Sequence, residues 1–131
     1  MIRTEPLETT EIEAEGVKLT VPTREEMFRI KAVLALKRNA TRDYLDLAAM
    51  GEILGDDGIR EALVKFDGYY PQPNGASPLQ QLANQLANPL PYDLDETDLS
   101  QYKNLDRQYQ DWSHVRDICA HIAVAVIHPM L

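Results

Sequence analysis

Helix-start signals are the feature that most constrains the fold of this sequence. In the first of them, the hydroxyl of Thr23 can cap a helix while Glu26, three residues later, completes a capping box. Each start is followed by apolar residues at a spacing of three or four, as an amphipathic helix requires. The four starts lie at Thr23, at Thr41, at Ser77-Pro78 and at Asp111. This pattern predicts a mainly α fold with five or six helices.

Turn signals set the expected ends of these helices. The first helix is expected to end at Arg38-Asn39-Ala40, and this short connection to a second helix, ending near Leu54, predicts an antiparallel pair. The segment Gly55-Asp56-Asp57-Gly58 is expected to separate that pair from a short helix. A helical turn is expected near 99–105. The last helix, Trp112 to about Ile127, is apolar on nearly all sides, which predicts a buried helix.

A β-hairpin is expected before the first helix. Residues 10–14 alternate between short or apolar side chains and glutamates, and Glu15-Gly16 then provides a turn. The following strand places Val17, Leu19 and Val21 on one face. An isolated hairpin is only marginally stable in water. We therefore expect this hairpin to pack on the helices or to pair its edge with strands from elsewhere.

Length and composition predict one domain over residues 1–131, made of a hairpin (7–21), an antiparallel helix pair (23–54) and a helical remainder (57–131). The single cysteine, Cys119, excludes an intramolecular disulfide and indicates a reducing compartment, which we take to be the cytoplasm. No apolar run is long enough to span a membrane. The net charge of −8 argues against direct binding to nucleic acid.

A run of charged residues on the first two helices is the candidate functional segment. It consists of Lys31, Arg38, Arg42, Asp43 and Asp46. Lys31 and Arg38 share a helical face about 10 Å apart along the axis. Arg42 and Asp46 have the i, i+4 spacing of an intrahelical ion pair. Such a set can hold a triphosphate, and it can equally form the ordinary ion pairs of a helical corner.

The order of these residues resembles the C-terminal half of the AbiEii-type nucleotidyltransferase toxins, in the polymerase β-like superfamily. The resemblance covers about Val17 to Leu54. It implies that Lys31 contacts nucleotide phosphates, with Arg38 and Arg42 on the phosphate side. It also implies that Asp43 or Asp46 is the late catalytic carboxylate of the family.

The part of that family that binds metal has no counterpart in this sequence. No glycine precedes a serine, and the Asp93-Leu94-Asp95 pair lies downstream in a segment flanked by prolines. We therefore expect the chain to be inactive alone, with no metal or cofactor of its own, whereas complete relatives would use Mg²⁺ and a nucleoside triphosphate. The resemblance thus predicts a nucleotidyltransferase-like helical module of a toxin–antitoxin system. Its expected partner is a second copy or a missing N-terminal half.

Two other functions compete with this one. The chain can be a protein-interaction module that dimerises or binds a partner through the hairpin edge or an exposed apolar face. It can also be a complete small enzyme that uses Lys31, Asp43 and Asp46, although no nucleophile–base pair accompanies them.

Two further groups of polar residues have simpler expected roles. His114, His121 and His128 are seven residues apart, too far along a helix to share one metal, and His121 is expected to be a hydrogen-bonded core residue. The acidic segment from Asp93 to Asp98 lacks the pattern of a calcium loop and is expected to be solvated.

Overall fold

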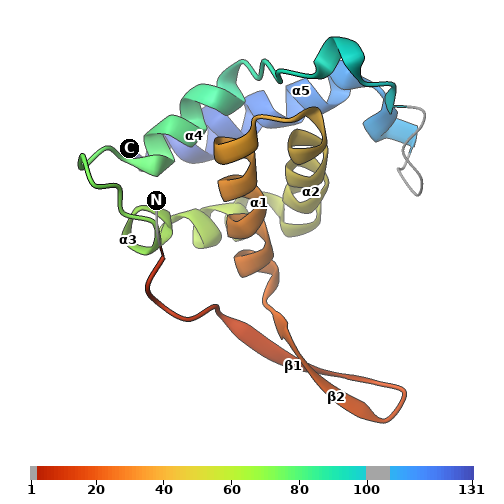
Figure 1. Ribbon diagram of the computed structural model, residues 1–131, viewed down its shortest axis with the longest axis vertical. Helices are drawn as coiled ribbons and strands as arrows, with labels where there is room; N and C mark the ends of the chain where they lie inside the picture. Colours follow the sequence, from red (N-terminus) through yellow and green to blue (C-terminus); the bar gives the residue numbers. More distant parts are fainter. Residues whose placement is uncertain (1–2, 100–106) are drawn as a thin grey trace.

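The computed structural model describes residues 3–99 and 107–131, and it confirms the mainly α fold with a small N-terminal hairpin (Figure 1). Within these residues, strands β1 (Thr9–Ala14) and β2 (Val17–Pro22) precede the helices α1 (Arg24–Arg38), α2 (Thr41–Leu63), α3 (Phe66–Tyr69), α4 (Pro78–Ala87) and α5 (Trp112–His121). The 3₁₀ turns η1 (Leu94–Glu96) and η3 (Arg107–Gln110) lie between α4 and α5, and the π-helix η4 (Ile122–Ile127) and the 3₁₀ turn η5 (His128–Met130) follow α5. The helical turn expected near 99–105 lies outside the described residues, apart from Leu99.

Three of the four expected helix starts have the expected N-cap side chain. The capping box predicted at Thr23 does not close, because the Thr23 amide donates to the Glu8 carbonyl while the Glu26 carboxylate accepts from the Glu8 amide at 3.3 Å. The hydroxyl of Thr23 accepts a hydrogen bond from the Glu26 amide at 3.1 Å, and that of Ser77 accepts one from the Gln80 amide at 3.1 Å. The carboxylate of Asp111 accepts one from the Ser113 amide at 3.0 Å. These caps connect residues two or three apart, which is why the sequence alone identifies them.

The start of α2 differs from the prediction. Ala40 occupies the cap position, and Thr41 is the first helical residue. The Asp93 carboxylate accepts hydrogen bonds from both the amide and the hydroxyl of Thr41, each at 2.7 Å. The expectation of a solvated acidic segment is therefore wrong at Asp93, because this side chain caps a helix that is distant in sequence.

The second helix bends at Gly55. Its backbone there has φ 71° and ψ 171°, a conformation that residues with a side chain rarely adopt. The helix resumes directly afterwards, so Asp56, Asp57 and Gly58 are helical residues rather than a separating loop. The bend changes the direction of the second half of α2 and lets Ile59 and Leu63 reach the core.

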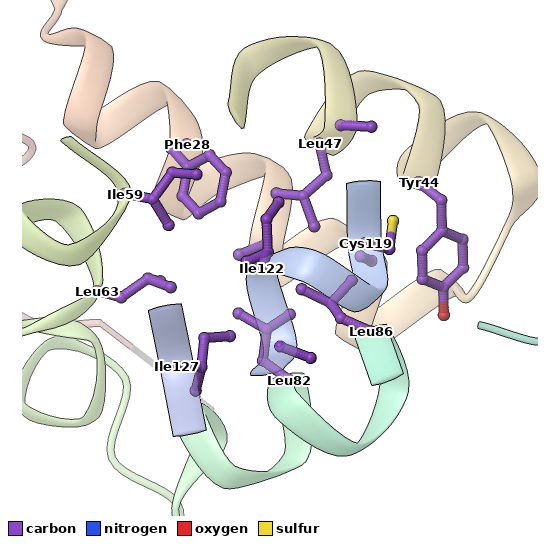
Figure 2. Packing of buried hydrophobic residues seen from close by; sticks show 14 of the residues in the cluster. Phe28, Tyr44, Leu47, Ile59, Leu63, Leu82, Leu86, Cys119, Ile122 and Ile127 are labelled. Carbon is purple, nitrogen blue, oxygen red and sulfur yellow. The ribbon is translucent and has the colours of Figure 1, made fainter. Parts of the chain in front are cut away.

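The hydrophobic core lies between α1, α2, α4, α5 and η4 (Figure 2). Its fully buried members include Phe28 from α1, Leu47 from α2, Leu82 from α4 and Ile127 from η4. Burying side chains of this size stabilises a fold by about 1.5–3 kcal/mol each. The last helix continues from α5 into the π-helical segment η4, but Val124 is 66% exposed, so the expected burial on all sides is wrong there.

The hairpin pairs as expected, with Ile12 opposite Leu19 and a turn at Glu15-Gly16, where φ is 51° and 79°. It projects away from the helices (Figure 1), and both Ile12 and Leu19 are more than two-fifths exposed. The expected packing of the hairpin onto the helices is therefore wrong.

A buried polar cluster fixes the chain just before the hairpin. The side chains of Glu26 and Arg29 are almost completely buried, and they pair with each other at 2.7 Å. Arg29 also pairs with Glu8 at 2.9 Å, and Arg3 pairs with Glu26. The Arg3 guanidinium lies 4.2 Å from the centre of the Tyr69 ring. Each buried charge is thus compensated, as burial requires.

Candidate functional site

The structure brings the five predicted site residues together at the corner between α1 and α2, in two groups. Arg38 forms two hydrogen bonds with the Asp43 carboxylate, one of them 3.2 Å long. Lys31 Nζ and Arg42 Nε each lie 3.5 Å from an oxygen of Asp46, so the expected Arg42–Asp46 ion pair is confirmed. Each aspartate at this corner therefore has a basic partner within the same corner.

The burial of these pairs indicates what they do. Asp43 is only 1% exposed and is held by Arg38, whereas Lys31, Arg42 and Asp46 are partly exposed. Around them, the loop before η1 packs on the same corner: the Asn39 side chain donates to the Leu90 carbonyl at 3.0 Å, and the Tyr92 amide donates to the Asn39 carbonyl at 3.1 Å. This geometry describes ordinary ion pairs: Lys31–Asp46 and Arg38–Asp43 join α1 to α2, and Arg42–Asp46 lies within α2.

A groove between α2 and α5 is the second candidate site, and the sequence did not indicate it. Its volume is about 360 Å³. Ile59, Ile118 and Ile122 form its apolar floor. Gly51 allows the two walls to approach closely, because a Cβ atom there would lie 3.1 Å from Ile122 Cδ1. The remaining lining residues are Glu52, Gly55, Asp56, His114, Asp117 and His121.

The rim of this groove is polar and predominantly acidic. His121 Nε2 lies 3.0 and 3.1 Å from the two Asp56 carboxylate oxygens. The His121 side chain is 55% exposed, so its expected place in the core is wrong. The reason is that the bend at Gly55 brings Asp56 to the surface beside α5.

The other end of the rim contains Glu52 from α2 and His114 and Asp117 from α5. The Tyr109 hydroxyl donates to Glu52, and His114 Nε2 lies 3.9 Å from Glu52 Oε1. This His114 nitrogen is buried and has no hydrogen-bond partner among the described residues. Asp117 is 76% exposed, with Arg116 Nε at 3.9 Å. With neutral imidazoles, the rim carries three carboxylates and one neighbouring guanidinium.

The geometry of the described residues favours neither metal binding nor thiol chemistry. Among residues 3–99 and 107–131, no group of three or more histidine, cysteine, aspartate or glutamate side chains is arranged to hold a metal ion. Cys119 is fully buried in the core, and this burial raises the pKa of its thiol to about 12. The thiolate that nucleophilic chemistry needs is therefore scarce at neutral pH.

No helix within the described part of the chain is both long enough and apolar enough to cross a membrane.

The chain is similar to one segment of several mycobacterial transport proteins. The chain is 33% identical over 128 residues to a protein named heme uptake protein MmpL11 in Mycobacterium tuberculosis, a match that covers 95% of this chain and 13% of that protein. It is 30% identical over 125 residues to the mycolic acid-containing lipids exporter MmpL11 of Mycolicibacterium smegmatis, covering 93% of this chain and 13% of the exporter. No family model and no solved structure matches the chain.

These matches overturn the resemblance to nucleotidyltransferase toxins. They extend over nearly the whole chain and lead to transport proteins, so the nucleotidyltransferase-like module and its place in a toxin–antitoxin system are wrong. The roles of Lys31, Arg38, Arg42, Asp43 and Asp46 in phosphate binding or catalysis rested on that resemblance and lose their basis with it. The comparisons also give no clear support to an interaction module that dimerises or binds a partner through the hairpin edge or an exposed apolar face. The physical reason for the error is that a short run of lysine, arginine and aspartate arises equally from ion pairs between helices.

Proposed function

We propose that this chain acts outside the membrane as a helical domain of an MmpL11-type transport system, on the cytoplasmic side. The observation that carries the proposal is the 33% identity that extends over 95% of the chain. The chain spans 13% of the length of that relative, so the match concerns one segment of a much larger transport protein.

The properties of the chain support a cytoplasmic place for this domain. Its one cysteine is buried and free, which suits a reducing compartment. Its net charge of −8 complements the excess of lysine and arginine that membrane proteins carry in their cytoplasmic loops.

The charge of the groove favours a supporting role over direct contact with the cargo. The printed names of the relatives assign heme uptake to one protein and lipid export to another. Heme carries carboxylate groups, and the three carboxylates on the groove rim repel them. We therefore assign this chain a part in assembling or controlling the transporter.

A segment exchange tests the proposal. The matched segment of the M. smegmatis exporter is replaced by this chain, and export of mycolic acid-containing lipids is measured in cells that lack their own copy. We expect the chimera to restore export, because the two segments share a fold. The same exporter carrying an unrelated helical domain of similar length is the control. Failure of a chimera that accumulates at the normal level, or full export by the control, would contradict the proposal.

A further inference from the structure

We propose that the groove between α2 and α5 docks a short basic protein segment, which inserts one apolar side chain between its walls and places lysine or arginine side chains over its rim. The proposal concerns a surface different from the hairpin and from the charged corner. It rests on the proposed function for the identity of the partner only.

The volume of the groove limits the size of the side chain that can enter it. Its volume of about 360 Å³ is near the lower end of the roughly 300–1,000 Å³ typical of ligand pockets. Its floor consists of Ile59, Ile118 and Ile122. Ile59 and Ile122 are already buried, so the half-buried Ile118 offers the apolar surface that a docked side chain would cover. A space of this size suits one such side chain and its neighbours.

The acidic rim favours positively charged residues next to the inserted side chain of the partner. Acidic residues stand on both walls, with Glu52 and Asp56 on α2 and Asp117 on α5. Asp56 and Asp117 are 47% and 76% exposed, so an arriving cation reaches them without a large desolvation cost. The acidic rim repels anionic lipid headgroups and favours lysine or arginine.

The proposed transport role indicates which protein segment could occupy the groove. Membrane proteins carry an excess of lysine and arginine in cytoplasmic loops close to their membrane-spanning helices. Such segments combine positive charge with adjacent apolar residues, which is the combination that the groove selects. The occupant that we infer is therefore a basic segment next to a membrane span of the transport protein.

Peptide binding tests this inference. Overlapping 15-residue peptides that cover the segments of the M. smegmatis exporter outside its membrane spans are titrated into the full chain and followed by fluorescence anisotropy. We expect binding only by peptides that combine lysine or arginine with a large apolar residue. Amide chemical shifts are expected to change in residues 51–59 and 114–122. Binding by acidic peptides, or by no peptide, would overturn the inference.

Two matched double variants separate the groove from general charge attraction. Asp56→Asn with Asp117→Asn is expected to weaken the binding of the best peptide by about tenfold, since two cation–carboxylate interactions are lost. Glu11→Gln with Glu13→Gln removes the same charge from the exposed hairpin and is expected to leave binding within about twofold. Equal effects of the two double variants would overturn the inference. Thermal unfolding of each variant verifies that the fold is retained.

A third variant tests the apolar floor. Ile118→Ala shortens a half-buried floor residue, and we expect weaker binding with no change in its salt dependence.

If the chimera restores export while no peptide binds, the groove inference fails and the proposed function stands. If basic peptides bind at the groove while the chimera fails, the groove is supported and the proposed function fails.

Discussion

At the scale of single residues, Asp93 determines how α2 begins. It lies 52 positions from Thr41 in the sequence and accepts two hydrogen bonds from it. Burial opposes the charge of Asp93, but the hydrogen bonds from Thr41 outweigh that effect and lower the pKa of this carboxyl. Its negative charge also stands at the positive end of the α2 dipole.

Replacing Asp93 by alanine is expected to lower the free energy of unfolding by about 1–2 kcal/mol, the usual cost of losing a helix cap. Urea denaturation followed by circular dichroism measures this loss. Asp95→Ala, an exposed change of the same kind in the same segment, is the control and should cost less than about 0.5 kcal/mol. Equal losses in the two variants would show that Asp93 has no special role in capping α2.

Glu8 has a comparable role at the buried polar cluster. The hydrogen bond from the Tyr69 hydroxyl, at 2.6 Å, is the largest influence, and those from Lys65 and Arg29 add to it against the opposing effect of burial. Together they lower the pKa of Glu8 from 4.5 to about 2. The folded state therefore favours the ionised form of Glu8.

The pH dependence of stability should reveal this interaction. A carboxyl with a lowered pKa stabilises the fold above its unfolded pKa of 4.5, and this stabilisation disappears as the pH falls toward about 2. Glu8→Gln is expected to cost about 1–2 kcal/mol at pH 7, because solvent reaches this side chain and screens its charge. The difference between wild type and variant, measured by urea denaturation from pH 7 to pH 2, should shrink to near zero. A difference that is independent of pH would contradict this assignment.

At the scale of elements, the bend in α2 positions the groove. Gly55 has a backbone conformation that other residues rarely adopt, and the residues on both sides of it are helical. The bend brings Asp56 beside His121 and turns Ile59 toward the core. One glycine thereby decides where the acidic rim of the groove lies.

Gly55→Ala is expected to destabilise the protein by about 1–3 kcal/mol, because alanine at this φ and ψ is strained although there is space for its Cβ atom. Gly68→Ala in α3 is the control. It also has open space and lacks a positive φ, so it should leave the stability unchanged or raise it by up to about 1 kcal/mol. Differential scanning calorimetry of both variants makes the comparison, and equal melting temperatures would contradict the role of the bend.

At the scale of the whole molecule, α1, α2, α4, α5 and η4 contribute to one core (Figure 2). Cys119 belongs to this core and has no exposed surface, and burial raises the pKa of its thiol to about 12. A thiol in this position becomes accessible only when helices separate. Its reactivity should therefore report the opening of the core as a unit.

Labelling with a thiol reagent at pH 8 is expected to be at least about 100-fold slower for the native protein than for the protein in denaturing urea. The control is Ser113→Cys in a Cys119→Ala background, which places the thiol on the exposed side of α5 and should react rapidly without denaturant. Rapid labelling of native Cys119 would show that the core opens locally rather than as a unit.

The fold class and most element boundaries followed from the sequence because the interactions that set them are local. Helix caps connect residues two or three apart, helical periodicity needs a window of a few turns, and the hairpin turn involves two residues. The Arg42–Asp46 ion pair, four residues apart on one helix, was predictable for the same reason.

Only the tertiary structure decided which distant side chains meet. The cap from Asp93 to Thr41, the pair of His121 with Asp56 and the pair of Arg29 with Glu8 join separate segments of the chain. None of these contacts leaves a periodic or spaced pattern in the sequence. The sequence by itself thus determined the local elements, whereas the groove depends on how two helices pack around a bend, because its walls come from segments about 60 residues apart.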